Sequence, residues 1–542
     1  MKFYWVVLWS LWAARLVQQP TPLVHVTGGW LRGVLAPDGS HKRYLAIPYA
    51  RHPIKRFQGP DVNLNWDGVF EAIEENVRCF QRIGESLVVG QKNCLTLNIY
   101  TPLDASHNSR YPVMVFFHGG GFYDGSATPY MYGPDYIVSK GVILVTVNYR
   151  LNIQGFGCLR IKEAPGNAGL KDQVAALKWI QNNIKAFGGD SDNVTIFGES
   201  AGAASVSLHI VSPMSKGLFH RAIMQSGSSL SSWVLQFKPV YMASLITKVM
   251  GHLTEDAQEL YKILLNKSDS ELIVTRVPRK EGNIIISECL YTPCIEKQFE
   301  GIEPFLTAVP YNVLTKGHYN KVPIMIGSNI EEGLLFASLE NDTTIPNIKL
   351  EKSLPKDLSI PLESERKKIG DKLRNYYIGD EEISKRTLAN LSRFHGEVYF
   401  TYPILEETEI YLNTNDKPVY SYLFKYSGWR NLIKLAIGKT FESKKGATHA
   451  EDLFYLFRVM GLPTLFEDKM INRMTTLWTN FAKFGDPTPA VSELVPLRWP
   501  AATLSSPVSF VIDEEFSISH LWYTDSLKYL RDVYTKYRRK RD

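Results

Sequence analysis

The residues Val194-Thr195-Ile196-Phe197-Gly198-Glu199-Ser200-Ala201-Gly202 hold the strongest structural signal in this chain. The first four are apolar or β-branched and predict a short buried strand, whereas the small residues from Ala201 to Val211 predict a helix. A serine between them, in a G-x-S-x-G pattern, is typical of a sharp strand-to-helix turn with room only for small neighbours. Such a turn exposes the Ser200 hydroxyl and leaves the Ala201 amide free to stabilise a negative oxygen.

A second glycine-rich motif lies upstream of the serine. The apolar run Pro112–Phe117 predicts a buried strand, and it continues into His118-Gly119-Gly120-Gly121-Phe122. Three consecutive glycines let backbone N–H groups turn inward, as in the H-G-G-G oxyanion loop that accompanies serine elbows. Alone, the triplet also fits a flexible hinge. Its position about eighty residues before Ser200 favours the oxyanion loop, in which each donor typically lowers the barrier by ~3–4 kcal/mol.

A reactive serine also needs a base and a carboxylate that orients it. Six histidines follow the serine: His209, His220, His252, His318, His395 and His449. The first two are too close in sequence to turn back, and His318 and His395 lie in polar surroundings. His449 lies in a small-residue stretch before an apolar segment, which makes it the predicted base. Glu331 and Glu332 follow the predicted strand 322–327, and either could be the acid, since adjacent side chains cannot both face the histidine.

Together these motifs resemble the carboxylesterase type B, or cholinesterase-like, family of the α/β-hydrolase fold. The similarity extends over nearly the whole chain after the N-terminal leader. The matching stretches are Ile47–Ala50, Cys94–Tyr100, His118–Ser126, Val147–Leu151, Gly166–Gln173, Phe187–Asp190, Gly198–Gly202 and Gln225–Ser228. The family places its catalytic acid directly before a glycine, which implies Glu332 and supports His449. The run Gly446–Phe457 resembles insect α-type or antennal carboxylesterases.

The resemblance implies further roles for individual residues. The amides of Gly120, Gly121 and Ala201 would form the oxyanion hole, and the Ser226 hydroxyl would support the acid. Trp233 matches an acyl-pocket aromatic, although an ordinary buried tryptophan is an equally good interpretation. Arg150 and Asp172 match a structural ion pair, and Cys79 and Cys94 match a loop disulfide. Of the other three cysteines, Cys289 and Cys294 could close a short loop, which would leave Cys158 as a free thiol.

Departures from the family pattern narrow the expected substrates. Cholinesterases carry a tryptophan between the first two cysteines, where it holds a quaternary ammonium. Here the segment 79–94 has only Phe80, so choline esters are not expected to be favoured. Juvenile hormone esterases usually have glutamine before the serine, and Glu199 argues against that role. Lys92-Asn93 replaces an acidic pair, which puts the family's ion pair to Arg56 in doubt.

The 542 residues predict one large domain over 15–542, because no linker or repeat divides the motifs. Strand-like runs at 113–117, 142–149, 194–197, 221–225, 322–327 and 419–424 are separated by helical stretches such as 169–187. This alternation predicts a large, mostly parallel sheet flanked by helices. Insertions near 235–315 and 340–415 are expected to form the walls of an active-site gorge, and the last helix is expected near 518–535.

Residues 1–14 resemble a signal peptide, with Lys2, an apolar run and Ala13-Ala14, and predict a secreted protein with disulfides. The leader is too short to span a bilayer, so stable membrane insertion is not expected. Sequons occur at Asn193, Asn266, Asn341 and Asn390, of which the last three are expected to be exposed and glycosylated. A net charge of +6 over this length does not indicate nucleic-acid binding. The cysteines and histidines do not have the spacing of metal ligands.

The sequence thus predicts a secreted serine carboxylesterase that needs no cofactor. It would hydrolyse small-molecule esters, such as xenobiotic, odorant or pheromone esters, through an acyl-enzyme at Ser200. Two alternatives belong to other classes: a slow-turnover scavenger of esters or organophosphates, and a non-catalytic adhesion protein like the neuroligins. Adhesion relatives have lost the serine, which is present here. The sequence does not indicate an oligomeric state.

Overall fold

The computed structural model describes residues 19–84, 86–441, 444–461, 467–522 and 524–539; the predicted signal peptide lies outside these ranges. An 11-stranded sheet in the order β16-β15-β14-β13-β12-β11-β9-β10-β8-β4-β3 forms the centre. Its strands are β3 (Val34–Leu35), β4 (His41–Pro48), β8 (Thr96–Pro102), β9 (Tyr111–Phe117), β10 (Ile143–Val147), β11 (Gly189–Glu199), β12 (Arg221–Gln225), β13 (Ile324–Asn329), β14 (Val419–Phe424), β15 (Val508–Ile512) and β16 (Ser517–His520). Seven neighbouring strands of this sheet run parallel: β10, β9, β11, β12, β13, β14 and β15. Antiparallel strands flank them at both edges. The predicted mostly parallel sheet is confirmed.

Two smaller β structures lie beside the main sheet. The strands β1 (Val24–Val26), β2 (Gly29–Arg32) and β5 (Val69–Glu71) form one, and β6 (Gln81–Ile83) pairs with β7 (Leu87–Val89) in the other. The hairpin β6–β7 lies within the loop that Cys79 and Cys94 close. This loop therefore has structure of its own beside the larger sheet.

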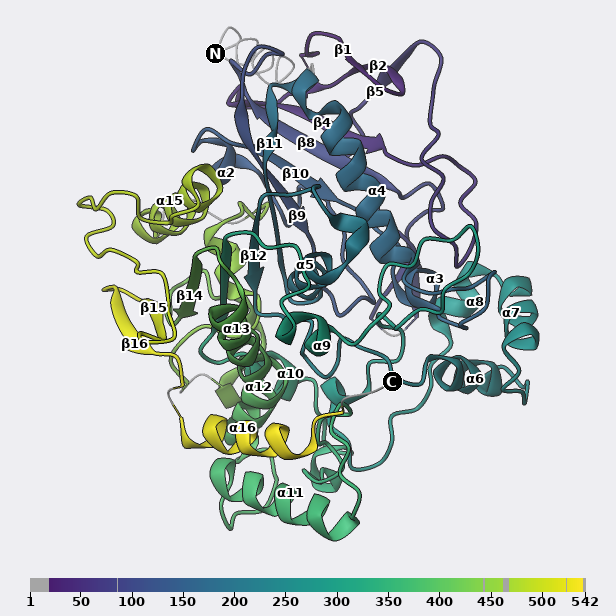
Figure 1. Cartoon of the computed structure of the whole chain (residues 1–542), viewed down its shortest axis with the longest axis vertical. Helices are drawn as coiled ribbons and strands as arrows, with labels where there is room; N and C mark the ends of the chain where they lie inside the picture. Colours follow the sequence, from purple (N-terminus) through teal and green to yellow (C-terminus); the bar gives the residue numbers. More distant parts are fainter. Residues whose placement is uncertain (1–18, 85, 442–443, 462–466, 523, 540–542) are drawn as a thin grey trace, which may run out of the picture.

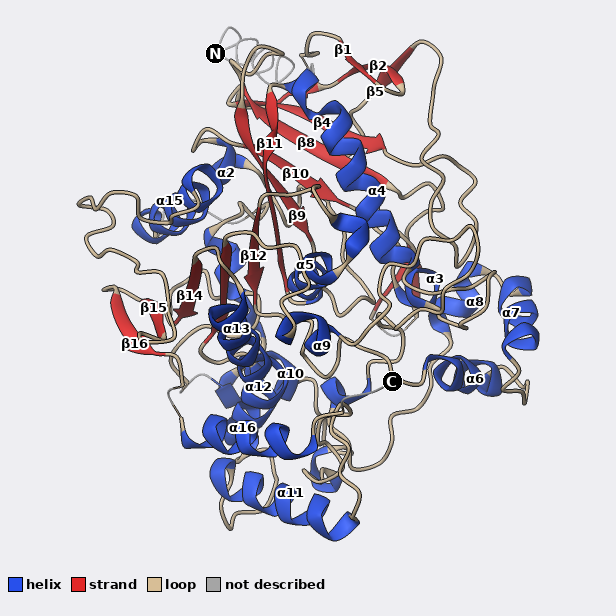
Figure 2. Cartoon of the chain, viewed as in Figure 1, coloured by secondary structure: helices blue, strands red, loops and turns tan. Residues whose placement is uncertain are grey.

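Helices cover both faces of the main sheet (Figure 2). The helices are α2 (Asp135–Val138), α3 (Asn152–Phe156), α4 (Ala168–Asn183), α5 (Ala201–Val211), α6 (Pro239–Val249), α7 (Ala257–Asn266), α8 (Asp269–Val274), α9 (Pro310–Thr315), α10 (Gly333–Ser338), α11 (Glu363–Tyr377), α12 (Leu388–Gly396), α13 (Tyr402–Thr414), α14 (Leu432–Ala436), α15 (Asp468–Phe484) and α16 (Asp525–Tyr537). Alternate residues of β9 serve two cores, because side chains alternate across a strand. Val113, Val115 and Phe117 pack with α4 and α5, whereas Met114 and Phe116 pack with α2 and α15.

The chain reverses its direction of travel across the sheet between β9 and β11. From β9 the chain adds β10 on one side, and it then crosses to place β11 on the other side. Ligands of open α/β sheets bind beyond the carboxyl ends of the strands at such a switch point. Here the two strands end in the His118 glycine loop and in Ser200, so the fold brings the two sequence motifs together (Figure 1).

The six predicted strands are all present, and the predicted helix at 169–187 forms α4 and a following 3₁₀ turn. The prediction for the last helix is wrong at its start. Residues Ser517–His520 form the edge strand β16, and α16 begins only at Asp525. A hydrogen-bonded partner, β15, determines this strand, and a single sequence does not show such a partner.

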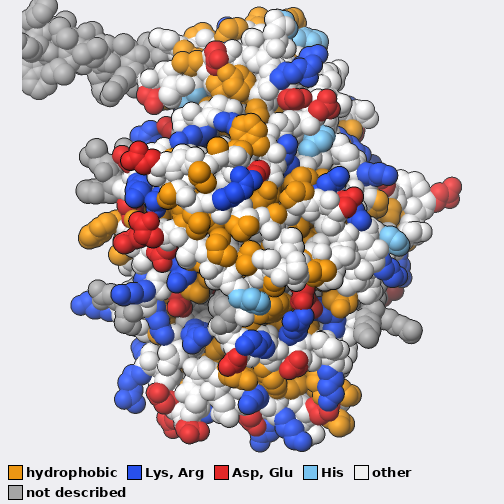
Figure 3. All heavy atoms as spheres, turned by 60° about the vertical axis from the view of Figure 1, so that its left-hand side comes forward, with side chains coloured by type: hydrophobic (Ala, Val, Ile, Leu, Met, Phe, Trp, Pro, Cys, Tyr) orange, Lys and Arg blue, Asp and Glu red, His pale blue; other side chains and the backbone are white. Residues whose placement is uncertain are grey.

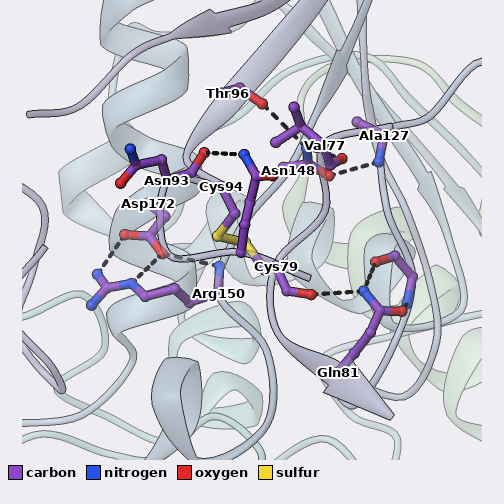
Figure 4. Close-up of a disulfide and its surroundings, with 12 residues drawn as sticks. Val77, Cys79, Gln81, Asn93, Cys94, Thr96, Ala127, Asn148, Arg150 and Asp172 are labelled. Atoms are coloured by element: carbon purple, nitrogen blue, oxygen red, sulfur yellow. Dashed lines mark hydrogen bonds and ion pairs between the residues drawn. A yellow bond between two sulfur atoms is a disulfide. The ribbon is translucent and has the colours of Figure 1, made fainter. Parts of the chain in front are cut away.

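Two disulfides cross-link the described chain. Cys79 and Cys94 are bonded, as expected, close to the buried ion pair of Arg150 and Asp172 (Figure 4). Cys158 is bonded to Cys294, and Cys289 is the free cysteine. The expectation that Cys289 pairs with Cys294 and leaves Cys158 free is therefore wrong. Asn167 explains the pairing, because its side-chain bonds to the backbone of Cys294 bring the inserted segment against the start of α4.

Two ion pairs concern arginines that were singled out in the sequence, Arg150 and Arg56. Arg150 and Asp172 form the expected pair, with Nη2 and Oδ1 2.6 Å apart and both side chains buried. Arg56, whose family ion pair was in doubt, has its own acidic partner in Asp269, 2.6 Å away, and Gln154 donates to the same carboxylate. An acid from the 235–315 insertion thus pairs with Arg56.

The surface drawn in Figure 3 carries interspersed basic and acidic side chains. Asn266 and Asn341 are exposed, as their sequons require, but Asn390 is only half exposed and lies within α12. Ser392 of the same sequon is buried, so the expectation of full exposure at this site is wrong. In the described ranges, no helix combines the length and the apolar character that crossing a membrane requires.

Removal of the Cys158–Cys294 disulfide is expected to destabilise the fold. The bond joins residues 136 apart, and closing so long a loop stabilises a protein by roughly 2–5 kcal/mol, chiefly by restricting the unfolded chain. We expect the double variant Cys158→Ser/Cys294→Ser to lose that much in chemical denaturation, whereas the control Cys289→Ser retains the wild-type midpoint. Peptide mapping without reduction is expected to find alkylation at Cys289 alone. Equal midpoints for both variants would contradict this pairing.

Candidate active site

Ser200 lies at the turn between β11 and α5 in a backbone conformation that L-residues rarely adopt. Its φ is 58° and its ψ is −121°, and its amide donates to the Gln225 carbonyl at 2.9 Å. The neighbouring glycines leave the room that this turn needs. A Cβ on Gly202 would lie 1.9 Å from the carbonyl oxygen of Phe117, and one on Gly198 would lie 2.5 Å from the carbonyl carbon of Gly202. The two glycines of the G-x-S-x-G pattern are therefore required by the close packing of α5 against β9 and β11.

Three backbone amides face this serine from two directions. Gly120 and Gly121 have φ values of 102° and 61°, a left-handed backbone that glycine adopts without strain. Among the described residues, no hydrogen-bond acceptor is bound by the amides of Gly120, Gly121 or Ala201. The loop is held instead through other atoms: Tyr149 donates its hydroxyl to the His118 carbonyl at 2.6 Å. The three amides predicted as an oxyanion hole are thus available to a ligand.

His449 and Glu332 come together although 117 residues separate them in the chain. Glu332 lies three residues after the end of β13, and its Oε2 lies 2.6 Å from Nδ1 of His449. The other carboxylate oxygen, Oε1, accepts hydrogen bonds from the Ser226 hydroxyl and from the Asn329 amide. Glu331 contributes a backbone bond to the Ala447 carbonyl. Of the two adjacent glutamates, Glu332 is therefore the one that contacts the histidine.

The remaining histidines stay outside this cluster of charged groups. His209 is buried in α5 and bonds to Gln173 and Ser215. His395, expected in polar surroundings, is fully buried in α12, with its Nδ1 3.0 Å from the Leu391 carbonyl. Burial lowers the pKa of both imidazoles, so neither is charged near neutral pH.

Glu199 faces the other nitrogen of the same imidazole. Its Oε1 lies 3.1 Å from Nε2 of His449. Burial raises the pKa of Glu199 to about 8, an effect that the positive charge of His449 opposes. Burial lowers the pKa of His449, but the negative charges of Glu199 and Glu332 outweigh it and raise the pKa to about 9. The buried pair therefore stabilises the imidazolium, which is the form that a general base becomes after it takes a proton.

The described residues show no hydrogen bond between the Ser200 hydroxyl and His449. Both side chains line the same cavity, and Nε2 is the imidazole nitrogen turned toward Glu199 next to the serine. In ligand-free sites such serine–histidine bonds are often long and tighten only when substrate binds. Ser200 and His449 thus line one cavity, and the Glu199 carboxylate can compete with the serine for Nε2.

A third carboxylate, Asp452, supports the His449 loop from behind. It accepts hydrogen bonds from Gln225 at 2.7 Å and from Asn329 at 3.3 Å. Asn329 also donates to the Thr448 carbonyl at 2.7 Å, directly before the histidine. Strands β12 and β13 therefore fix the position of the loop through buried polar contacts, which leave His449 little freedom to turn away.

A cavity of about 660 Å³ opens onto these groups. Its walls are mostly apolar and aromatic: Tyr123, Met131, Tyr132, Trp233, Ile285, Ile286, Cys289, Leu335, Phe336, Leu339, Phe400, Ile433, Ala450, Leu453 and Phe454. The polar exceptions besides the catalytic groups are Arg82 and Asp124. Both predicted insertions contribute, the first through Ile285 to Cys289 and the second through Phe400. A largely apolar cavity with few polar groups is suited to a small organic ligand.

Trp233 is a buried residue that also reaches the cavity. It lines the cavity, and it is also almost fully buried, with its indole N–H donating to the Tyr399 carbonyl at 3.0 Å. The aromatic residues Phe336 and Phe400 pack against the His449 ring, with ring centroids 5.0 and 4.6 Å away. Neither was predicted from the sequence, since a phenylalanine in a helical stretch is more often an ordinary core residue.

Glu199 and Asp452 were also missed as members of the site, although both lie within quoted motifs. Each is next to a predicted catalytic residue or within three residues of one, and each is a buried carboxylate. That combination of proximity and charge is the one signal in the sequence that could have indicated them.

Comparison with known proteins bears on the family and the fold of this chain. The model of the carboxylesterase family matches residues 20–529. The chain is 35% identical over 499 residues to Esterase FE4 of Myzus persicae, covering 88% of this chain and 86% of the relative. It is 32% identical over 532 residues to the juvenile hormone esterase of Tribolium castaneum, covering 92% and 89%.

A solved structure shows the same architecture. Juvenile hormone esterase from Manduca sexta, with OTFP covalently attached, superposes with a TM-score of 0.83 at 28% identity, covering 95% of this chain and 99% of that one. The α/β-hydrolase fold that the sequence resemblance implied is confirmed. The protein belongs to the carboxylesterase family and is a carboxylic ester hydrolase.

Proposed function

We propose that the protein is a secreted serine carboxylesterase in which Ser200 is the nucleophile, His449 the general base and Glu332 the residue that orients the base. The observation that supports this most directly is the 2.6 Å contact between Glu332 and His449 at the cavity that Ser200 lines. A carboxylate on Nδ1 fixes the imidazole tautomer, so that Nε2 is left to take the serine proton.

The reaction follows from these positions. Ser200 attacks the ester carbonyl while Nε2 of His449 accepts its proton, and the Gly120, Gly121 and Ala201 amides stabilise the resulting oxyanion. The imidazolium then protonates the departing alcohol. Water, deprotonated by the same histidine, hydrolyses the acyl-enzyme and releases the acid. Ser226 acts through Glu332, since its hydroxyl donates to the carboxylate oxygen that does not contact the histidine.

The cavity supports esters with apolar chains as substrates. Apolar and aromatic side chains dominate its walls, and Trp233 with Phe400 would limit the acyl pocket, their ring centroids being 5.6 Å apart. The names of the relatives include both general esterases and juvenile hormone esterases. The segment between Cys79 and Cys94 still provides no tryptophan for a quaternary ammonium. Neutral xenobiotic, odorant or pheromone esters fit these walls better than choline esters.

Secretion is supported by two observations of different kinds. The first 14 residues have the composition of a signal peptide. The described chain also has two disulfides, which form and persist in oxidising compartments. Glycosylation is proposed at Asn266 and Asn341, whose side chains are exposed, and is least expected at Asn390 because Ser392 of that sequon is buried.

Replacement of the nucleophile tests the proposal. We expect Ser200→Ala to lower kcat for p-nitrophenyl butyrate by at least ~10⁴-fold while the thermal midpoint stays within a few degrees. The matched control is Ser338→Ala, since that hydroxyl bonds only to the Leu335 carbonyl in its own helix. In stopped flow, the wild-type enzyme should release a burst of one equivalent of p-nitrophenol before steady turnover. A burst without turnover would indicate a scavenger, and turnover by Ser200→Ala would contradict the assignment.

Removal of the carboxylate beside Nε2 is expected to shift the pH profile. His449 must be neutral to accept the serine proton, and anionic Glu199 stabilises the protonated form. The uncharged Glu199→Gln side chain should therefore lower the histidine pKa and move the acid limb of the kcat/KM profile to lower pH by about one unit or more. Glu331→Gln is the control, because that carboxylate does not contact the imidazole. An unmoved limb in Glu199→Gln would show that Glu199 is already uncharged when the enzyme is active.

The dependence of kcat/KM on the length of the substrate's acyl chain tests whether the cavity binds apolar chains. Each methylene group that leaves water contributes ~0.8 kcal/mol, so two more should raise kcat/KM by roughly tenfold. We expect p-nitrophenyl butyrate to exceed the acetate by about that factor, and the octanoate to gain less per carbon once its chain reaches Trp233. A kcat/KM that falls from acetate to butyrate would indicate that the acyl pocket admits only the shortest chains.

A further inference from the structure

A second cavity, of about 400 Å³, lies apart from the serine and opens near the C-terminal end of the chain. It is formed by α6, by the segments 277–290 and 352–358, by the beginning of α11 and by Arg539. We call it the basic cavity. Its volume falls within the range of ~300–1,000 Å³ that is usual for small-molecule sites.

The charge of this cavity is one-sided. Six cationic side chains line it: Lys238, Lys280, Lys352, Lys356, Arg366 and Arg539. Among the lining side chains that the structure describes, none is an aspartate or a glutamate. Asp357, which lies beside this wall in sequence, is paired with Arg538 instead. The cavity is therefore positively charged although the whole chain carries a net charge of only +6.

Within the described part of the chain, Lys352, Arg366 and Arg539 form no ion pair with a carboxylate. Lys352 donates to the backbone carbonyl of Glu281, and Arg366 donates to the backbone carbonyl of Glu351. Such bonds occupy N–H groups without neutralising the charge. The Nε atom of Arg539 is buried and has no hydrogen-bond partner among the described residues, while its guanidinium stacks 4.8 Å from the Phe237 ring. A buried donor without a partner is costly, so an anionic acceptor here would be favourable.

The floor of the basic cavity is apolar. Met242 and Leu245 of α6 line it together with Leu354 and Leu358, of which the last two are almost fully buried. A purely ionic ligand such as phosphate would leave this surface uncovered. An anion with an aliphatic chain can contact both the cations and the apolar lining of the cavity. Arginine binds a carboxylate through two parallel hydrogen bonds, while the chain covers the leucines.

The basic cavity shares one residue with the active-site cavity. Cys289 lines both, and the amides of Leu290 and Tyr291 donate to the hydroxyl of Tyr123, which follows the glycine loop directly. The segment around Cys289 therefore borders both cavities, and it is bonded to Tyr123, directly after the loop that contains Gly120 and Gly121. A ligand that packs against this segment is expected to affect turnover without entering the active site.

We propose that the basic cavity is a binding site for a single-chain aliphatic carboxylate. The head group would contact Arg366, Arg539 and Lys352, and the chain would lie on Met242, Leu245, Leu354 and Leu358. This site is separate from the one at Ser200 and does not depend on which residue is the nucleophile.

Isothermal titration with dodecanoate, below its micelle concentration, tests the proposal. The triple variant Lys238→Gln/Lys352→Gln/Arg366→Gln removes three cavity charges. The control, Lys297→Gln/Lys417→Gln/Lys469→Gln, removes three charges from exposed lysines elsewhere. We expect the cavity variant to bind dodecanoate at least about tenfold more weakly than wild type, and the control to stay within about twofold. Dodecanol, which lacks the charge, should bind the wild type about as weakly as dodecanoate binds the cavity variant. Turnover of p-nitrophenyl butyrate and the thermal midpoint report that each variant is folded.

Three results would overturn the proposal. Equal affinity in the cavity variant and the wild type would place dodecanoate elsewhere, with the active-site cavity as the obvious location. Absence of binding to the wild type would remove the site altogether. Co-sedimentation with phosphatidylserine vesicles that is lost in the cavity variant, without binding of free dodecanoate, would assign the same cations to a membrane surface instead.

Discussion

The contact between the end of β9 and the first turn of α5 is the constraint on which the active site depends. Gly202 lies so close to the Phe117 carbonyl that a single added carbon would overlap it. That approach holds Ser200 at a positive φ and points it at the loop leaving β9. Because the two strands are hydrogen-bonded neighbours, Ser200 and the amides of the glycine loop keep a fixed separation. The strained backbone is thus stabilised by the sheet itself, and the site needs no flexible segment to assemble its serine and its oxyanion donors.

Buried negative charges around the His449 imidazole are the second constraint on the site. Three buried carboxylates, of Glu199, Glu332 and Asp452, surround one imidazole, and each has a different set of partners. Glu332 is held by two hydrogen bonds to its remaining oxygen, and Asp452 is held by amide side chains. Glu199 lacks such bonds on Oε1, which makes it the carboxylate whose charge depends most on the state of the histidine. The three groups together favour a positive charge at the point where it develops during catalysis.

Most of the fold, and the residues proposed to act in catalysis, could be predicted from the sequence because they lie in short local motifs. The strand runs, Ser200 with its glycines, and Glu332 before Gly333 each depend on a few neighbouring residues. Features that depend on contacts between distant segments could not be predicted. The pairing of Cys158 with Cys294 is set by the docking of the 235–315 insertion, and β16 exists because β15 lies beside it. Phe336 and Phe400 are members of the site only because α10 and the 340–415 insertion both pack against the His449 ring.

The Cys158–Cys294 bond has a consequence for how the enzyme matures. The insertion that supplies Ile285, Ile286 and Cys289 to the active-site cavity is joined covalently to the body of the protein only through this cross-link and its own two ends. Cys289 lies five positions before Cys294 and offers the same thiol chemistry, so oxidative folding must choose between two sulfur partners for Cys158. The wrong choice would shift the insertion along the molecule and displace one side of the substrate pocket. The position of one wall of the active-site cavity therefore depends on which thiol Cys158 joins.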